Sequence, residues 1–340
     1  MLNQLRSFWL IIFCFILYSS FVTHEIACVQ EKKITVVIPS YNNKEWYERN
    51  LDSVLDQDYS NYRVIYTDDV STDGTGELVA AYIEKYGAQD KITLVKNKKH
   101  QGALYNLYRM IHSCEDNAII VTLDGDDWFP NDRVLKRLNS VYSSDEVWLT
   151  YGQFQMYPHG TMGWATAMPK QIVKNNAFRE YVHLPTHLRT FYAWLFKKIK
   201  LEDFLYNGKF FTMTWDMAMM FPMIEMTGER HRFIPDVMYI YNDANSISDH
   251  RISRQLQAHL AQVMRNKKPY NRLNQQPTDK IKNNRKADLI VFSDDSSNQL
   301  ARLIEEIERH ITGAGKINIL YRGSTAKEIE QYSDCLLYTS

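Results

Sequence analysis

The chain of 340 residues is long enough to bury a sizeable core and to hold one large domain or two smaller ones. Lysines plus arginines equal aspartates plus glutamates, at 40 each, which excludes a global basic field for nucleic acid, so any charged ligand must bind at a local site. The four cysteines are scattered without metal-type spacing and indicate neither a disulfide framework nor a redox compartment.

The first feature in the chain is an uncharged, aromatic-rich apolar run, Phe8–Val22, which follows Arg6. Such a run is typical of a signal peptide or a short membrane anchor. It is short for a span, because a bilayer crossing usually needs about 20 apolar residues. The sequence therefore predicts that residues 1–31 either anchor the protein to a membrane or direct its export. The choice between the two, and the side of the membrane, stay open.

The globular part opens with a βαβ pattern. Ile34–Ile38 is a β-branched run followed by Pro39, which cannot donate to a ladder, so we expect the first strand to close there. Apolar residues at helical spacing over Trp46–Leu55 predict a helix, and Tyr62–Tyr66 predicts a second strand. The turn after the first strand lacks the Gly-rich pattern of a dinucleotide site, and the sequence contains no phosphate-binding P-loop.

Further alternation of helices and strands follows. We expect a helix to about Tyr86, a strand near Ile92–Val95 and a helix over Ala103–Ile111. A polar stretch, residues 68–75, comes directly after the second strand. Because open α/β sheets bind ligands at the carboxyl ends of their strands, this stretch belongs to a candidate site.

An apolar run that ends in three carboxylates is the most informative stretch. Ala118–Leu123 is typical of a strand buried on both faces, and Asp124, Asp126 and Asp127 follow it. These carboxylates repel one another and resist desolvation, which indicates that a cation or a polyhydroxyl ligand completes the site. The alternative is a solvated turn that caps a helix starting near Asn131. An oxygen-only ligand set favours a hard cation such as Mg²⁺ or Mn²⁺.

Four motifs together resemble the nucleotide-sugar motifs of family 2 inverting glycosyltransferases of the GT-A fold. In chain order they are PSYN at 39–42, DDxSTDGT at 68–75, Gly102 with Asn106, and LDGDD at 123–127. The resemblance is closest over residues 34–127 and continues more loosely to about His250. It implies an α/β domain over residues 32–265, with a mixed, Rossmann-like sheet flanked by helices.

The resemblance also implies roles for the motif residues. Tyr41 and Asp69 would contact the nucleotide base, and Asp124 would contact the ribose or the metal. Asp126, with Asp127, would hold a divalent Mn or Mg ion that bridges the diphosphate of a nucleotide-sugar donor. The other donor-binding residues that the resemblance implies are Pro39, Asp73 and Gly102.

The middle of the chain is less specific. Val147–Tyr151 predicts a strand, and the aromatic, Gly- and Pro-rich residues 152–169 lie where the family receives its acceptor, although we interpret any single aromatic there as core or loop. Thr190–Phe196 predicts a buried strand or a helix entry. His183 and His187 flank Pro185, and we interpret each as a satisfied polar residue rather than a ligand.

Asp216 opens an apolar segment that runs to Met226. In related enzymes the catalytic base is an aspartate at the start of a helix, usually preceded by an acidic residue, and Trp215 replaces that neighbour here. The resemblance implies that Asp216 is the base; the alternative is a helix N-cap. Without the acidic neighbour, only burial would raise its pKa. Pro222 predicts the start of a helix or a kink.

The C-terminal part begins with a predicted strand, Phe233–Tyr241, and a polar loop, residues 242–251. In that loop His250 is a candidate third metal ligand, with a surface histidine as the alternative. Residues 266–286 are polar and basic and predict a linker. After it, a strand–helix–strand pattern predicts a partial second glycosyltransferase-like unit over residues 287–340, too small to fold by itself. Its parts are strand 287–293, helix 298–311 and strand 317–321.

The sequence as a whole predicts metal-dependent, inverting transfer of a sugar from a nucleotide-sugar donor to an acceptor hydroxyl of a glycan or glycoconjugate. One alternative is a non-catalytic sugar- or nucleotide-binding protein on the same fold, which Trp215 favours. Another is a sugar-nucleotide nucleotidyltransferase, which should carry a Gly-rich, basic loop after the first strand; the sequence PSYNN is neither. The identities of donor and acceptor stay open.

Overall fold

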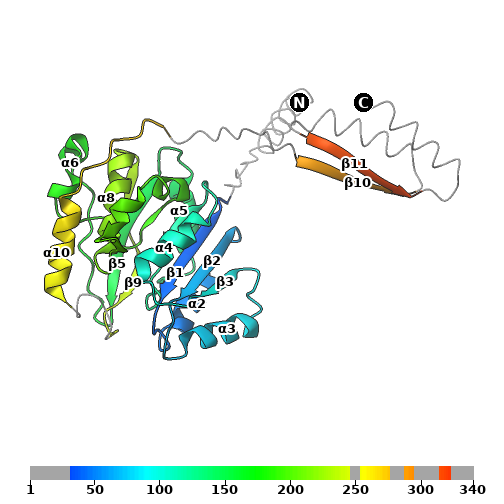
Figure 1. Ribbon diagram of the computed structural model, residues 1–340, viewed down its shortest axis with the longest axis horizontal. Coiled ribbons are helices and arrows are strands. Elements are labelled where there is room, and N and C mark those ends of the chain that lie inside the picture. The colour runs from blue at the N-terminus through cyan, green and yellow to red at the C-terminus, as the bar shows by residue number, and fades with distance from the viewer. Residues whose placement is uncertain (1–30, 246–252, 276–286, 295–313, 323–340) are drawn as a thin grey trace, which may run out of the picture. The chain divides into compact units, whose positions relative to one another are not determined.

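The computed structural model describes residues 31–245, 253–275, 287–294 and 314–322 (Figure 1). The predicted N-terminal apolar segment, His250 and the predicted helix 298–311 lie outside these residues. Within the described ranges, no helix has the length and apolar character needed to cross a membrane. The chain divides into two compact units, residues 1–273 and 274–340.

The first unit is built on one seven-stranded sheet with the strand order β3-β2-β1-β4-β6-β5-β9. β1 to β4 pair in parallel, β6 is antiparallel to both of its neighbours, and β9 is parallel to β5. All strands except β6 therefore end at the same edge. Their bounds are β1 Ile34–Ser40, β2 Tyr62–Asp68, β3 Ile92–Lys96, β4 Ile119–Thr122, β5 Leu149–Tyr157, β6 Thr190–Tyr192 and β9 His231–Asn242.

Helices cover this mixed sheet, which confirms the predicted α/β class. In Figure 1, α3 lies toward the β3 end of the sheet, whereas α8 and α10 lie toward the β5–β9 end. The helices are α2 Tyr47–Leu55, α3 Thr75–Lys85, α4 Ala103–His112, α5 Val134–Tyr142, α6 Lys170–Asn175, α7 Ala193–Phe196, α8 Trp215–Thr227 and α10 Arg254–Arg265. Shorter elements are the 3-10 turns η1 Phe178–Glu180 and η2 Leu201–Phe204, and the hairpin strands β7 Leu205–Tyr206 and β8 Lys209–Phe210.

Most predicted elements are found within a few residues of their predicted bounds, because their apolar patterns match the burial. Every residue of β1 and β4 is buried, as expected of strands covered on both faces. β1 nevertheless runs through Pro39 to Ser40. Its pairing with β4 ends at Val37, so the missing N–H of Pro39 breaks no ladder bond. α5 begins at Val134 rather than near Asn131.

α8 is buried over almost its whole length, which explains its Met-rich, non-periodic sequence. Pro222 lies inside this helix rather than at its start. Glu225, also in α8, is fully buried and pairs with Arg179 of η1, with an Nε–Oε1 distance of 2.5 Å. α8 is therefore held in the core by an ion pair as well as by apolar packing.

Residues after α10 stay attached to the first unit further than the predicted linker start at residue 266 suggests. The backbone N–H of Tyr270 donates to Glu225 Oε2 at 2.9 Å, and that of Leu273 donates to Met226 O at 2.9 Å. In the second unit, β10 Ala287–Asp294 and β11 Ala314–Arg322 form a parallel pair where strands were predicted. The boundary between the two compact units thus falls after Leu273.

Removing residues 276–340 should leave soluble yield, melting temperature and nucleotide affinity close to those of the full chain. The hydrogen bonds of Tyr270 and Leu273 precede the cut, as does every motif named above. A chain ended after residue 268 is the matched control, and it should melt at a lower temperature because those bonds are lost. If the longer truncation fails to fold, the boundary after Leu273 is wrong.

Candidate functional site

The loops that follow β1, β2 and β4 meet at the carboxyl edge of the sheet. Tyr41, after β1, exposes 39% of its surface, and its ring centroid lies 4.6 Å from that of His100. Asp69, after β2, is buried and accepts hydrogen bonds from the backbone N–H groups of Gln101 (3.0 Å) and Gly102 (2.7 Å). Tyr41 thus offers an accessible ring, whereas the carboxylate of Asp69 holds the loop before α4 in place by hydrogen bonds.

Gly102 can make this hydrogen bond because its φ of 86° lies in the left-handed region, which glycine adopts without strain. Asp73 supports the neighbouring loop in a similar way. Its carboxylate accepts the backbone N–H of Thr75 at 3.0 Å and that of Lys44 at 3.0 Å. Burial alone would raise the pKa of Asp73, but these hydrogen bonds outweigh burial and lower it. Pro39 accepts the N–H of Gly125 at 3.2 Å.

The acidic loop after β4 is fixed against β1 and α2. A Cβ atom on Gly125 would lie 2.6 Å from Asn43 Nδ2 and 2.7 Å from Ser40 Oγ, so only glycine permits this close approach. From α2, Asn50 Nδ2 donates to the carbonyls of Asp124 (2.9 Å) and Asp127 (2.7 Å). The three carboxylates are therefore held in place rather than displayed on a solvated turn.

Asp127 is the most deeply buried of the three. Its carboxylate accepts the Tyr239 hydroxyl at 2.5 Å and the Asn242 N–H at 2.7 Å, both from β9. Burial, followed by the nearby charges of Asp126 and Asp124, raises its pKa well above the usual range. Asp126 Oδ2 accepts Asn245 Nδ2 at 2.7 Å. A cation bound beside these carboxylates would offset the burial and the repulsion that raise the pKa of Asp127.

A group that fits a divalent ion includes a residue from outside the loop. One ligand atom each of Asp124, Asp127 and His187 lies within 4.8 Å of the other two. His187 Nε2 is 3.6 Å from Asp124 Oδ2, and its ring stacks on Tyr239 with centroids 4.4 Å apart. Two carboxylates suit Mg²⁺ or Mn²⁺, and the imidazole adds a nitrogen donor.

His183 and His187, interpreted from the sequence as satisfied polar residues, are only partly satisfied: His183 Nε2 faces Asp216 Oδ2 at 3.3 Å, and His187 Nε2 faces Asp124 Oδ2 at 3.6 Å. Within the part of the chain that the structure describes, the Nδ1 atoms of His187 and His183 are buried without a hydrogen-bond partner. Burial, with the positive charge of Arg189, lowers the pKa of His187 to about 4, so the ring is neutral and able to bind a metal. Spacing could not reveal this role, because His187 is far from the acidic loop in sequence.

Asp216 lies at the second position of α8. The N-cap is Thr214, so the N-cap alternative does not describe Asp216. Its Oδ2 atom lies 3.3 Å from Arg189 Nη2 and 3.3 Å from His183 Nε2. Burial alone would raise the pKa of Asp216, but the His183 hydrogen bond and the Arg189 charge outweigh burial and hold it far below its usual range.

The expected upward tuning by burial is therefore reversed, and Asp216 is ionised at neutral pH. Trp215 has a role of its own, because the Arg189 guanidinium lies 5.5 Å from its ring centroid. Close by, Trp164 exposes 59% of its surface and donates Nε1–H to the carbonyl of His183 at 3.3 Å. The Asp216 carboxylate thus lies against the ring of His183, and the indole of Trp164 donates to its backbone carbonyl.

Comparisons with known proteins agree on one family. The model described as "Glycosyl transferase family 2" matches residues 35–221. The "Putative teichuronic acid biosynthesis glycosyltransferase TuaG" of Bacillus subtilis (strain 168) is 29% identical over 128 residues, which cover 38% of this chain and 49% of TuaG. The "Putative glycosyltransferase EpsE" of the same organism is 33% identical over 98 residues, covering 28% of this chain and 33% of EpsE. The matched segments span less than half of either relative.

Among solved structures, the chain is similar to S. aureus TarS 1-349 in complex with UDP-GlcNAc, with a TM-score of 0.48 and 16% identity. That match covers 68% of this chain and 66% of the TarS chain. The mannosyltransferase PcManGT from Pyrobaculum calidifontis, in complex with GDP-Man and Mn²⁺, gives a TM-score of 0.47 and 23% identity. It covers 71% of this chain and 66% of that chain.

Proposed function

The chain belongs to glycosyl transferase family 2, whose model covers residues 35–221 of its 340, and on that premise we propose that it transfers a sugar from a nucleotide-sugar donor to an acceptor hydroxyl with inversion. Its mixed sheet flanked by helices is the GT-A architecture expected of such a member. The observation that carries the proposal is that one segment faces both groups: His187 lies against Asp124 of the acidic loop, and His183, four residues earlier, lies against Asp216.

The donor side is supported by the loops after β1 and β4. Tyr41 offers an exposed ring for a nucleotide base, and Asp124, Asp127 and His187 form a group that fits Mn²⁺ or Mg²⁺, with Asp126 beside it. A divalent ion bound there would neutralise negative charge on the leaving diphosphate. His250, the predicted third ligand, lies outside the described residues, so His187 is the histidine that we propose.

The transfer itself needs a base on the acceptor side. The acceptor oxygen attacks the anomeric carbon, the bond from that carbon to the diphosphate oxygen breaks, and the nucleoside diphosphate leaves with the electron pair. We propose that the ionised Asp216 accepts the hydroxyl proton. Arg189 and His183 hold its carboxylate in one orientation, and the exposed Trp164 offers a surface for the acceptor.

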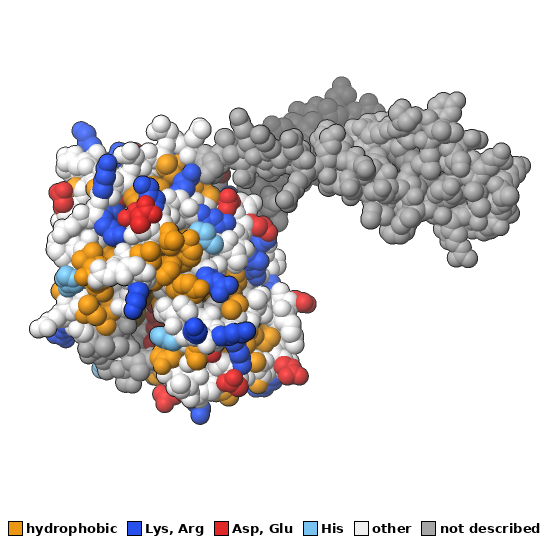
Figure 2. All heavy atoms as spheres, viewed as in Figure 1, with side chains coloured by type: hydrophobic (Ala, Val, Ile, Leu, Met, Phe, Trp, Pro, Cys, Tyr) orange, Lys and Arg blue, Asp and Glu red, His pale blue; other side chains and the backbone are white. Residues whose placement is uncertain are grey.

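Two alternatives lose support. Trp215 favoured a non-catalytic protein because it replaces an acidic residue, but it packs on Arg189 and leaves Asp216 facing His183. A nucleotidyltransferase would need a basic, Gly-rich loop after β1, and that loop carries Tyr41 and two asparagines instead. The surface does not present a single-sign field either: Lys and Arg are interspersed with Asp and Glu on the described face drawn in Figure 2.

Binding of a nucleoside diphosphate should require a divalent ion, because the carboxylates of the acidic loop would otherwise repel it. Calorimetry with UDP and with GDP, in Mn²⁺ and then in excess chelator, measures this requirement. Asp126→Ala should weaken the Mn²⁺-dependent binding severely. Asp90→Ala, an exposed carboxylate between α3 and β3, should leave the affinity unchanged.

Equal affinity in Mn²⁺ and in chelator would remove the metal from the proposal. A screen of nucleotide sugars for turnover with the same protein then tests the transferase activity itself. Donor binding without any turnover would favour the sugar-binding alternative.

A further inference from the structure

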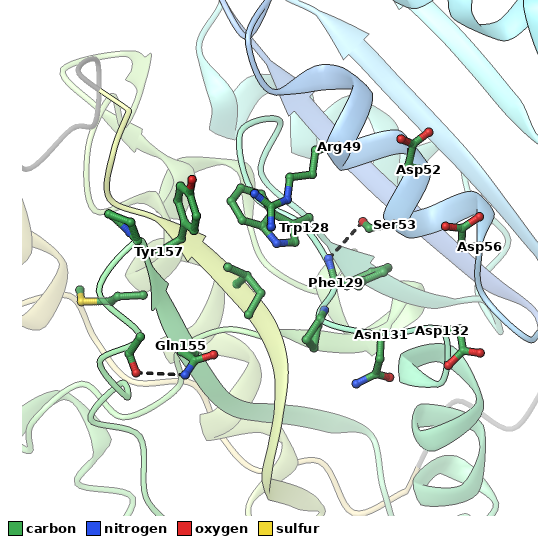
Figure 3. Close-up of a pocket in the computed structure, with 15 residues that line it drawn as sticks. Arg49, Asp52, Ser53, Asp56, Trp128, Phe129, Asn131, Asp132, Gln155 and Tyr157 are labelled. Carbon is green, nitrogen blue, oxygen red and sulfur yellow. Dashed lines mark hydrogen bonds between the residues drawn. The ribbon is translucent and has the colours of Figure 1, made fainter.

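A hollow is lined in part by the residues that directly follow the acidic loop (Figure 3). Its volume is about 580 Å³, within the roughly 300–1,000 Å³ typical of small-ligand sites. α2, residues 128–132, the end of β5 and Ile240 of β9 line it. Neither the proposed donor and metal residues nor Asp216 belong to its lining, so the proposed transfer leaves this cavity unexplained.

The loop after β4 carries both the acidic residues and part of the cavity lining. Asp127 turns its carboxylate to Tyr239 and Asn242, whereas the next residue, Trp128, lines the cavity. The backbone of Trp128 is fixed to β9, because its N–H donates to Ile240 O at 3.3 Å and its carbonyl accepts from Ile240 N at 2.9 Å. The Trp128 wall of the cavity is therefore held by β9, the same strand that holds Asp127.

Arg49 lies over the aromatic part of that wall. Its Cζ atom is 3.7 Å from the Trp128 ring centroid and 5.1 Å from that of Tyr157, and Figure 3 shows the guanidinium beside the indole. This cation already covers the indole face, so an ammonium ligand has no open aromatic cage here. A stacked guanidinium keeps its N–H groups in its own plane, where they can donate to a ligand.

Three carboxylates also line the cavity (Figure 3). Asp52 belongs to α2 and accepts the Tyr82 hydroxyl, Asp56 is the C-cap of α2, and Asp132 follows the acidic loop. One arginine among three carboxylates disfavours a phosphate or carboxylate ligand. Asn131 and Gln155 add amides, each of which can donate and accept.

We propose that this cavity binds a neutral sugar unit of a glycan, apart from the proposed donor and metal residues. Sugar hydroxyls both donate and accept, so hydroxyls on different parts of a sugar unit can accept from the Arg49 guanidinium and donate to the carboxylate of Asp56 or Asp132. The apolar face of a pyranose ring can pack on Tyr157 and Pro158. This binding goes beyond the proposed transfer and does not depend on it, because neither donor nor turnover is required.

Calorimetry and saturation-transfer NMR of the full chain with maltotriose, cellotriose and mannotriose test the proposal. At least one should bind saturably at concentrations up to about 10 mM. Arg49→Ala and Asp56→Asn should each weaken that binding about tenfold or more. Glu48→Ala, an exposed neighbour on α2 that does not line the cavity, should not. Melting temperatures confirm that each variant is folded.

The same titration in saturating UDP with Mn²⁺, and with the Asp216→Asn variant, separates this cavity from the reacting centre. Unchanged oligosaccharide affinity in both supports the proposal. Three results would overturn it: no saturable binding of any of the three sugars, wild-type affinity in Arg49→Ala, or displacement of the sugar by UDP. Tighter binding of an acidic heparin oligosaccharide than of the neutral ones would contradict the charge argument.

Discussion

Asp216→Asn should lower kcat by at least about a hundredfold while nucleotide affinity stays nearly unchanged, since general base catalysis contributes typically about 10²–10⁴-fold to rate. Asparagine keeps the size of the side chain but cannot accept the acceptor proton. The donor residues at the ends of β1 and β4 do not contact Asp216 in the described structure, whose partners are Arg189 and His183. The measurement is steady-state turnover with the donor found by screening, alongside calorimetry with UDP or GDP.

This variant should also be less stable, and the design must separate the two effects. Arg189 is buried, with a side chain only 5% exposed, and it would lose its carboxylate partner. The double variant Asp216→Asn with Arg189→Met removes the unpaired charge and should recover melting temperature without recovering kcat. Asp236→Asn, an exposed surface carboxylate paired with Arg137, is the matched control and should leave both unchanged. A wild-type kcat in the Asp216→Asn variant would reject Asp216 as the base.

Arg179→Met should lower the free energy of unfolding by about 3–5 kcal/mol, the usual cost of leaving one partner of a buried pair unpaired. The Arg179 side chain is 7% exposed, and the Glu225 side chain is fully buried. Arg179 donates from Nε to Glu225 Oε1 at 2.5 Å, from Nη2 to Oε2 at 2.9 Å, and from Nη1 to Met264 O at 2.6 Å. One guanidinium therefore joins η1, α8 and α10.

Urea denaturation measures the loss, with the linear dependence of unfolding free energy on urea as the readout. Lys136→Met breaks an exposed pair with Asp58 and is the matched control, which should leave the midpoint nearly unchanged. The double variant Arg179→Met with Glu225→Met should be more stable than Arg179→Met alone, because no buried charge is left unpaired. A single variant as stable as the parent would show that the pair contributes little to holding α8.

Sequence alone was enough for the order of elements from β1 to α5 and for most of the later strands. Buried strands read as continuous β-branched runs and amphipathic helices as 3.6-residue patterns, so local chemistry carried the information. It was also enough to place the acidic loop, residues 68–75 and Tyr41 at one edge, because parallel strands end on the same side of a sheet. The family followed from the same motifs in order.

Sequence was not enough for the detailed contacts of Asp69 and Asp73, because hydrogen-bond partners are chosen by packing. Both carboxylates were read as ligand contacts, yet in the described structure they accept N–H groups of neighbouring loops. Whether either also touches a donor stays a prediction. The sequence motif predicted where in the fold these two aspartates lie, but not which way their side chains point. A carboxylate in such a loop can face a ligand or accept N–H groups of the backbone.

Local sequence patterns could not predict contacts between residues that are far apart in the sequence. His187 joins Asp124, and Arg189 with His183 surrounds Asp216, because β6 inserts antiparallel between β4 and β5 and brings the segment before it to the site. The position of β6 in the strand order is determined by how whole strands pack together, and no local sequence motif specifies it. The electrostatics of the site follow from this order: the His183 hydrogen bond and the Arg189 charge reverse the pKa shift that burial alone would give Asp216. The pKa shift of a buried carboxylate depends on which charged groups lie next to it, and those neighbours are determined by long-range packing.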